Sequence, residues 1–224
     1  MARPREIRGL LVLLAVAICS WLLASARLRG LLWNTAILAC GAIAIGVPLG
    51  VVLGTMIAKI DIPGRRAVAG LMAAMLFVPL YVQAAAWNAV LGAGGWVPQL
   101  LAAEGEYADP WLVGWRGAIW VHAMGAVPWV ALMTAASLRA VERRLEEESL
   151  LDAPPWRVLL RVSLPRAGGG ILAAAVWVAV ICATEIAVTD LYQVRTFAEE
   201  IFTQASLGSL SGESGVLLSS DLAV

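Results

Sequence analysis

Long apolar stretches constrain this 224-residue chain more than any other feature of its sequence. Crossing about 30 Å of hydrocarbon takes about 20 apolar residues in a helix, and five stretches approach or exceed that length. They cover approximately residues 9–26, 33–58, 68–91, 117–138 and 168–189. Lipid offers no partner for free backbone groups, and no alternating pattern favours a barrel, so each stretch must be helical. The sequence predicts an all-α, polytopic membrane protein, a bundle of about five transmembrane helices.

The composition supports the same class. Hydrophobic residues make up 61% of the chain and charged residues 14%, and the mean hydropathy is +0.83. These values are typical of membrane proteins, and no basic tract is suited to nucleic acid, so we expect contact with membrane lipid instead. Cys19, Cys40 and Cys182 lie in apolar runs without metal-ligand or disulfide spacing. No metal site is therefore predicted.

The basic residues are unevenly distributed between the two sides of the predicted spans. With a cytoplasmic N-terminus, that side carries twelve of the sixteen: Arg3, Arg5, Arg8, Lys59, Arg65, Arg66, Arg139, Arg143, Arg144, Arg157, Arg161 and Arg166. The opposite side carries Arg27, Arg29, Arg116 and Arg195. Because cytoplasmic loops carry the excess of Lys and Arg, the N-terminus is predicted inside, segment 139–167 in the cytoplasm, and tail 190–224 outside.

Segment 139–167 is the most charged connection between predicted spans. From Ala140 to Leu151 its apolar and charged residues fall on opposite sides, which is typical of an amphipathic helix. Pro154 and Pro155 end that helix, because proline lacks a backbone donor and restricts the residue before it. A second short helix is expected over 156–162, stopped by Leu164-Pro165. The pair would present an apolar knob to another protein, made by Leu150, Leu151, Trp156 and Leu159.

These residues resemble the EAA loop of inner-membrane permeases of binding-protein-dependent ABC importers. The matching positions are Glu146, Leu150, Asp152, Ala153, Pro155, Trp156, Val162, Leu164 and Pro165. Asn34-Thr35, the turn at 61–66, and Pro79 with Tyr81 extend the similarity along the chain, and residues 185–200 look most like the iron(III)-type permeases. The chain departs from the family at the EAA alanines, which are Glu147 and Glu148 here, and at the usual turn glycine, which is Asp152. Aspartate tolerates turn conformations, so we expect the bend to survive.

The resemblance implies a transport permease subunit of the inner (plasma) membrane and not an enzyme. It implies that a cytoplasmic ABC ATPase dimer binds and hydrolyses ATP, and the sequence agrees, because it has no Gly-x-x-x-x-Gly-Lys-Ser/Thr loop. An external substrate-binding protein and a second permease copy or half are the other implied partners. The implied ATPase contacts are Glu146, Glu147, Leu150, Leu151, Asp152, Ala153, Pro155, Trp156, Leu164 and Pro165. Iron(III) is the favoured solute, with thiamine, sulfate, molybdate or another small solute as alternatives; no catalytic or cofactor-binding residue is predicted.

Polar side chains in or near spans are costly in lipid and are usually functional. Gln83, Asn88, Glu185 and Asp190 are therefore predicted to line the translocation pathway or its outer mouth, although interhelical or local pairing explains them as well. His122 is interpreted as a packing histidine.

Two other functional readings follow from the C-terminal part of the chain. Gly212-Glu-Ser-Gly215 matches a motif of intramembrane serine proteases, with Ser214 as nucleophile and His122 as base. Family permeases have at least six spans, so this chain is expected to lack a sixth. A truncated, non-transporting scaffold is then the second alternative.

Overall fold

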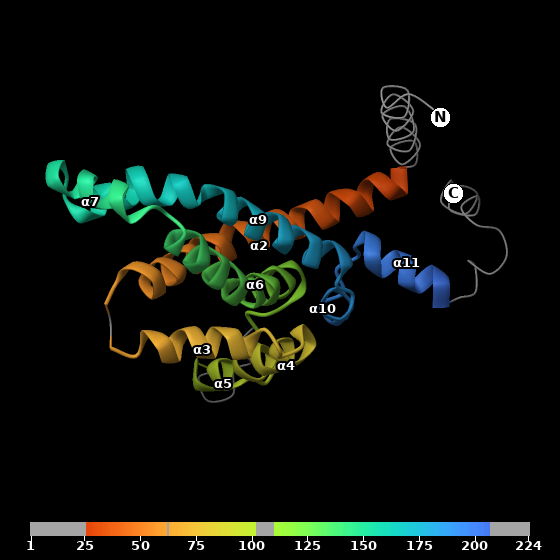
Figure 1. The fold of residues 1–224 in the computed structure, drawn as a ribbon. Coiled ribbons are helices and arrows are strands. Elements are labelled where there is room, and N and C mark those ends of the chain that lie inside the picture. The colour runs from red at the N-terminus through yellow and green to blue at the C-terminus, as the bar shows by residue number, and fades with distance from the viewer. Residues whose placement is uncertain (1–25, 62, 102–109, 207–224) are drawn as a thin grey trace, which may run out of the picture. The chain divides into compact units, whose positions relative to one another are not determined.

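The computed structural model describes residues 26–61, 63–101 and 110–206, and every regular element in these ranges is a helix (Figure 1). The predicted all-α fold is confirmed. The helices form two compact units, one containing the described residues up to Ala36 and from Arg195 onward, the other containing Ile37–Val194. Most of the predicted first span, and the end of the predicted tail, lie outside the described residues.

In the part of the chain that the structure describes, three helices are long and apolar enough to cross a membrane. They are α2 (Ala26–Lys59), α6 (Gly114–Arg139) and a continuous helix over Pro155–Thr184, and they coincide with the stretches expected at 33–58, 117–138 and 168–189. In the second unit, α6 is the central helix, because its buried residues recur around its whole circumference. One apolar core joins Leu38 of α2, Val121 and Val130 of α6, and Val178 of the third helix.

Small residues bring α2 and α6 into close contact. Gly46, Gly50 and Gly54 recur every fourth residue on one side of α2, a spacing that lets membrane helices approach closely. A Cβ atom added to Gly50 would lie 2.5 Å from Cβ of Val130, and one added to Gly54 would lie 2.5 Å from the backbone oxygen of Ala131. The packing distance of the two helices thus depends on the absence of side chains at these positions.

The stretch predicted as one span over 68–91 instead forms two helices, α3 (Arg65–Met75) and α4 (Leu80–Leu91), followed by the short α5 (Trp96–Leu101). The axis bends by 109° at the break. The N–H groups of the three residues after α3 donate to carbonyls three residues back, which tightens the last turn. Pro79 then adopts an extended conformation, with φ −55° and ψ 143°, and cannot donate to a continuing helix.

The charged connection forms α7 (Arg143–Asp152) and α8 (Pro155–Val158), but the prediction that Leu164-Pro165 ends the second helix is wrong. A π-helix, η1 (Leu159–Ser163), joins α8 to α9 (Leu164–Thr184) without a break. The N–H of Leu164 donates to the carbonyl of Leu159, five residues back. This wider turn makes room for the ring of Pro165, which would clash in a regular α-helix.

The bend between α7 and α8 does not use a left-handed residue. Ala153 has φ −145° and ψ 148°, and Pro154 has φ −65° and ψ 152°, so both are extended. Asp152 is the last residue of α7. The bend therefore forms without the glycine that is usual in the resembling family.

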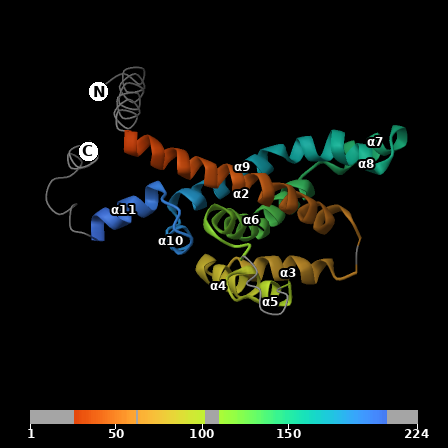
Figure 2. The same cartoon turned by 180° about the vertical axis from the view of Figure 1, so that it is seen from behind.

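The fifth predicted span ends earlier than expected. α9 stops at Thr184, and Glu185 has an extended backbone with ψ 133° before α10 (Ala187–Leu191). In the first unit, α11 (Phe197–Ser206) is tied to the start of α2: Arg27 pairs with Glu200, and the N–H of Phe197 donates to the hydroxyl of Thr35 at 3.1 Å. Figure 2 shows the fold from behind.

Candidate functional site

A cavity of about 220 Å³ lies within the second unit, between the break after α3, the middle of α6 and the last turns of α9. Its walls are mainly apolar, and Leu80, Trp129 and Ile181 contribute to them. The side chains of the wall that carry polar or sulfur atoms are Met75, Gln83, His122, Trp129, Cys182 and Glu185. Two of the predicted pathway residues, Gln83 and Glu185, thus share one cavity, whereas Asn88 and Asp190 are not among its lining residues.

His122 and Glu185 face each other at the cavity wall. The His122 side chain is fully buried, and its Nε2 lies 3.6 Å from Oε2 of Glu185. On the other edge of the ring, Nδ1 lies 2.8 Å from the backbone oxygen of Ala118. Since a carbonyl only accepts, Nδ1 carries a proton. In the neutral ring, Nε2 therefore presents a lone pair, and it has no hydrogen-bond partner in the described structure.

Glu185 is positioned by the turn that follows α9. Its two carboxylate oxygens accept from the N–H of Val188, at 3.2 and 3.0 Å, so the side chain caps the start of α10. The sequence left local pairing open as an explanation for Glu185, and the partner is a backbone N–H group. His122, interpreted from sequence as a packing residue, is indeed buried, but it also lines the cavity.

The predicted coupling segment exposes large apolar side chains. Leu151 is 85% exposed, Trp156 is 59% exposed and Leu150 is 46% exposed, and the Arg157 guanidinium stacks 5.2 Å from the ring centre of Trp156. Among the other predicted contacts, Glu147, Asp152, Pro155 and Pro165 are exposed, while Ala153 and Leu164 are half-buried. We call the exposed apolar group Leu150, Leu151, Trp156 and Leu160 the docking surface.

Glu146 is largely buried, unlike the residues of the docking surface. It accepts hydrogen bonds from Nζ of Lys59, at 2.6 and 2.7 Å, and from the Ser163 hydroxyl, at 2.5 Å. We call this group the latch. It joins the end of α2, the first turn of α7 and the end of η1. The predicted amphipathic faces of α7 are therefore partly wrong, because Glu146 turns inward whereas Leu150 and Leu151 turn outward.

The latch holds Glu146 in its charged form. Burial raises the pKa of the Glu146 carboxyl, but hydrogen bonds from Lys59 and Ser163, with the charges of Lys59 and Arg143, outweigh burial and lower the pKa below its usual value. A carboxyl whose pKa is lowered by folding stabilises the protein above its unfolded pKa. That contribution is lost as the pH falls through the lower folded pKa.

The effect of acid on the latch is a testable consequence. At neutral pH we expect Glu146→Gln to lower the free energy of unfolding in detergent by about 1–2 kcal/mol, because a charge-assisted bond becomes a neutral one. Denaturant titrations from about pH 7 down to about pH 2 should show a constant difference between wild type and variant above the ordinary carboxyl pKa of 4.5, and a difference that shrinks as the pH falls below that value. A difference that stays constant across this range would contradict the assignment.

Sequence reasoning missed several residues of these two sites. Lys59 was counted only among the basic residues that set orientation, and Ser163 carried no signal of its own. Trp129 and Cys182 lie in predicted spans and carried no functional signal in the sequence, yet both line the cavity. Ser214, the nucleophile of the protease alternative, lies outside the described residues.

Comparisons with known proteins agree with this architecture. The molybdenum transport system permease protein ModB of Haemophilus influenzae is 26% identical over 136 residues, which is 58% of this chain and 56% of that protein. The matched region thus spans little more than half the length of the curated relative. Among solved structures, the MetNI methionine ABC transporter in an inward-facing conformation matches with a TM-score of 0.59 and 21% identity, over 84% of this chain and 82% of that one. This second likeness concerns the fold alone.

The comparisons do not bear on the iron(III)-type resemblance, which stays a prediction. A family model, described as the inner membrane component of binding-protein-dependent transport systems, matches residues 46–210. These residues include the cavity, the latch and the docking surface. The chain belongs to this family of binding-protein-dependent transport system inner membrane components.

Proposed function

We propose that this chain is the permease subunit of an ABC importer, which moves a small solute across the inner membrane while a separate subunit hydrolyses ATP. The observation that carries the proposal is the docking surface, which is exposed and apolar on a segment too charged to lie in hydrocarbon. Contiguous exposed apolar side chains on a polar element mark a site of protein contact. The permease itself would then perform no ATP chemistry.

The docking surface fits a groove on a cytoplasmic ATPase subunit. Leu151 and Trp156 project from either side of the bend between α7 and α8. Exposed charges surround them, with Glu147 and Asp152 on α7 and Arg157 on α8. An apolar centre with a charged rim is the usual anatomy of a protein interface. Two such permease copies with an ATPase dimer, and an external binding protein, complete the assembly we propose.

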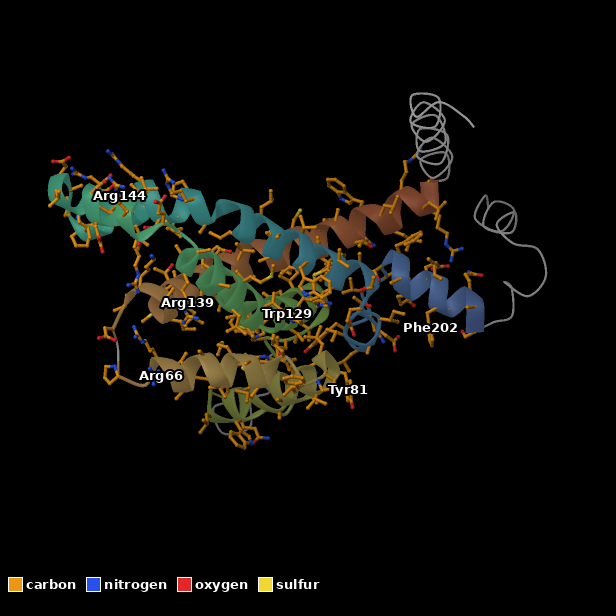
Figure 3. All side chains as sticks on the ribbon, viewed as in Figure 1. Arg66, Tyr81, Trp129, Arg139, Arg144 and Phe202 are labelled. Carbon is orange, nitrogen blue, oxygen red and sulfur yellow. The ribbon has the colours of Figure 1, made fainter. Side chains whose placement is uncertain are left out.

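The charge distribution supports an inward orientation of this surface. Figure 3 shows Arg66, Arg139 and Arg144 at one end of the second unit, with Tyr81 at the other end and Trp129 between them. Lys59, in the latch, contacts the same end through Glu146. Because basic residues favour the cytoplasmic side, we place the docking surface in the cytoplasm and, with five spans, the N-terminus also.

The cavity is our candidate for part of the solute pathway. It combines apolar walls with a few convergent polar groups, which is usual for small-molecule sites. Similarity to known permeases suggests two solutes: iron(III), from residues 185–200, and a form of molybdenum, from the name of the curated relative. Neither has direct support from the cavity, since no cluster of three metal-ligating side chains occurs in the described ranges and the cavity lining given above includes no Lys or Arg.

Replacing one leucine of the docking surface tests the proposal. We expect Leu151→Ser to weaken the complex with a co-produced ABC ATPase subunit by about tenfold, because it removes most of an exposed apolar contact. The measurement is the amount of ATPase that co-purifies with the tagged permease in detergent, over a series of ATPase concentrations.

Leu100 provides the matched control. It is 84% exposed on α5, so Leu100→Ser removes the same atoms from an equally accessible place away from the docking surface. The control should retain the ATPase at the wild-type level. If Leu151→Ser retained as much ATPase as the wild type, the proposed role of the docking surface would be contradicted.

A further inference from the structure

Three side chains of the cavity wall, His122, Glu185 and Gln83, carry acceptors, while Trp129 and Cys182 carry the donors of an indole N–H and a thiol. His122 presents the lone pair of Nε2, and Glu185 presents carboxylate oxygens. The side-chain amide of Gln83 uses its Nε2 to donate to the Val78 carbonyl at 3.1 Å, which leaves its oxygen for the cavity. Nε2 of His122 and Oε2 of Glu185 lie 3.6 Å apart. Both are acceptors when the imidazole is neutral, so neither donates to the other. A ligand that supplies donors would complete this arrangement.

The remaining wall suits a cation on an apolar stem. Trp129 lines the cavity, and an indole ring is the best aromatic partner for an ammonium group. Leu80, Val178 and Ile181 supply apolar surface. A small inorganic cation would lose its water shell against such a wall, whereas an alkyl group gains by entering it. An oxyanion would meet a carboxylate and lone pairs.

We propose that the cavity binds the ammonium group of a small organic cation between His122, Glu185 and Trp129. The inference rests on the proposed function, because it names the class of solute, or of inhibitor, that the permease pathway accepts. The ammonium donates to Nε2 of His122 and to the Glu185 carboxylate, and the apolar stem lies along Leu80 and Ile181.

Charge selectivity is the first test. Nanodiscs that contain the purified chain would be dialysed against labelled n-butylammonium, n-butanol or n-butyrate, with empty nanodiscs as the reference for lipid partitioning. We expect the protein to retain butylammonium above the reference, butanol weakly, and butyrate not at all. Equal retention of butylammonium and butyrate, or no retention of butylammonium, would overturn the proposal.

Two variants locate the site. Glu185→Gln removes the charge but keeps an oxygen that can accept from the N–H of Val188, so α10 stays capped; it should weaken butylammonium binding at least about tenfold. Trp129→Leu should weaken it about threefold, as the cation–π contact is lost. Asp61→Asn removes a carboxylate that is 93% exposed and is not among the residues that line the cavity, so it should leave butylammonium binding unchanged. Unchanged binding in Glu185→Gln would also overturn the proposal.

The result is separable from the proposed function. Co-purification of the ATPase depends on the docking surface and needs no small ligand. A chain that captures the ATPase but retains no butylammonium would refute the cation site and leave the permease assignment standing. A chain that retains butylammonium through Glu185 but captures no ATPase would refute the permease assignment alone.

Discussion

Gly54→Ala is expected to lower the free energy of unfolding by about 3 kcal/mol, because overpacking at a rigid contact is not relieved by a side-chain rotation. The new Cβ atom would lie 2.5 Å from the backbone oxygen of Ala131 and 2.8 Å from Cβ of Thr134. The helices α2 and α6 must then move apart along the line of Gly46 and Gly50. The thermal midpoint in detergent should fall by roughly 10 °C.

Gly70→Ala is the matched control for this change. Gly70 lies inside α3, and an added Cβ meets nothing within 4 Å. The substitution therefore has the same effect on helix propensity as Gly54→Ala, favourable by about 0.5–1 kcal/mol in an exposed helix, without the clash. If the two variants had the same midpoint, the close contact of α2 and α6 would not contribute to stability.

Reversing one charge of the latch should lower the free energy of unfolding almost as much as Gly54→Ala does. Lys59→Glu places a carboxylate beside Glu146, in a pair whose side chains are only 24% and 15% exposed. We expect a loss of about 2–3 kcal/mol, because a largely buried carboxylate loses its partner and gains a like charge. Denaturant titration of the purified variant in detergent measures the loss.

A charge swap and a surface pair serve as controls. Lys59→Glu combined with Glu146→Lys should recover at least half of the lost free energy, since an opposite-charge pair is restored. Arg65→Glu reverses a charge of the exposed pair Arg65–Asp61, whose side chains are 42% and 93% exposed, and should change the stability by no more than about 0.5 kcal/mol. A double variant as unstable as Lys59→Glu alone would show that the charge pairing is not what stabilises this contact.

The long helices could be predicted because each corresponds to a continuous apolar stretch of the sequence. A run of about 20 apolar residues is a property of adjacent positions, and α2 and α6 follow such runs closely. The bend at Pro79 was harder to predict, since membrane helices often continue through a proline, as α2 does at Pro48. Three tightened hydrogen bonds before Pro79 decide the outcome, and these depend on backbone geometry that the sequence does not express directly.

The prediction that the helix ends at Pro165 was wrong for the opposite reason. Proline was expected to end the helix, but a local change of hydrogen-bond spacing over Leu159–Ser163 accommodates it. The latch was missed because Lys59, Glu146 and Ser163 are far apart in sequence and belong to three elements. Gln83 and Glu185 stand out in the sequence as polar residues in apolar surroundings. Their association with His122 and Trp129 in one cavity depends on the arrangement of α3, α4, α6 and α9.

The π-helix has a mechanical consequence. Because it preserves continuity, one helix of 30 residues extends from Pro155 to Thr184, a rod about 45 Å long at 1.5 Å per residue. Trp156 stands at one tip, and Glu185 directly follows the other. A tilt of about 3° at the first tip displaces the second by about 2 Å over that length, comparable to the 3.6 Å gap between His122 and Glu185. We therefore expect a displacement imposed at Trp156 to be transmitted along one continuous helix to Ile181 and Cys182, which line the cavity.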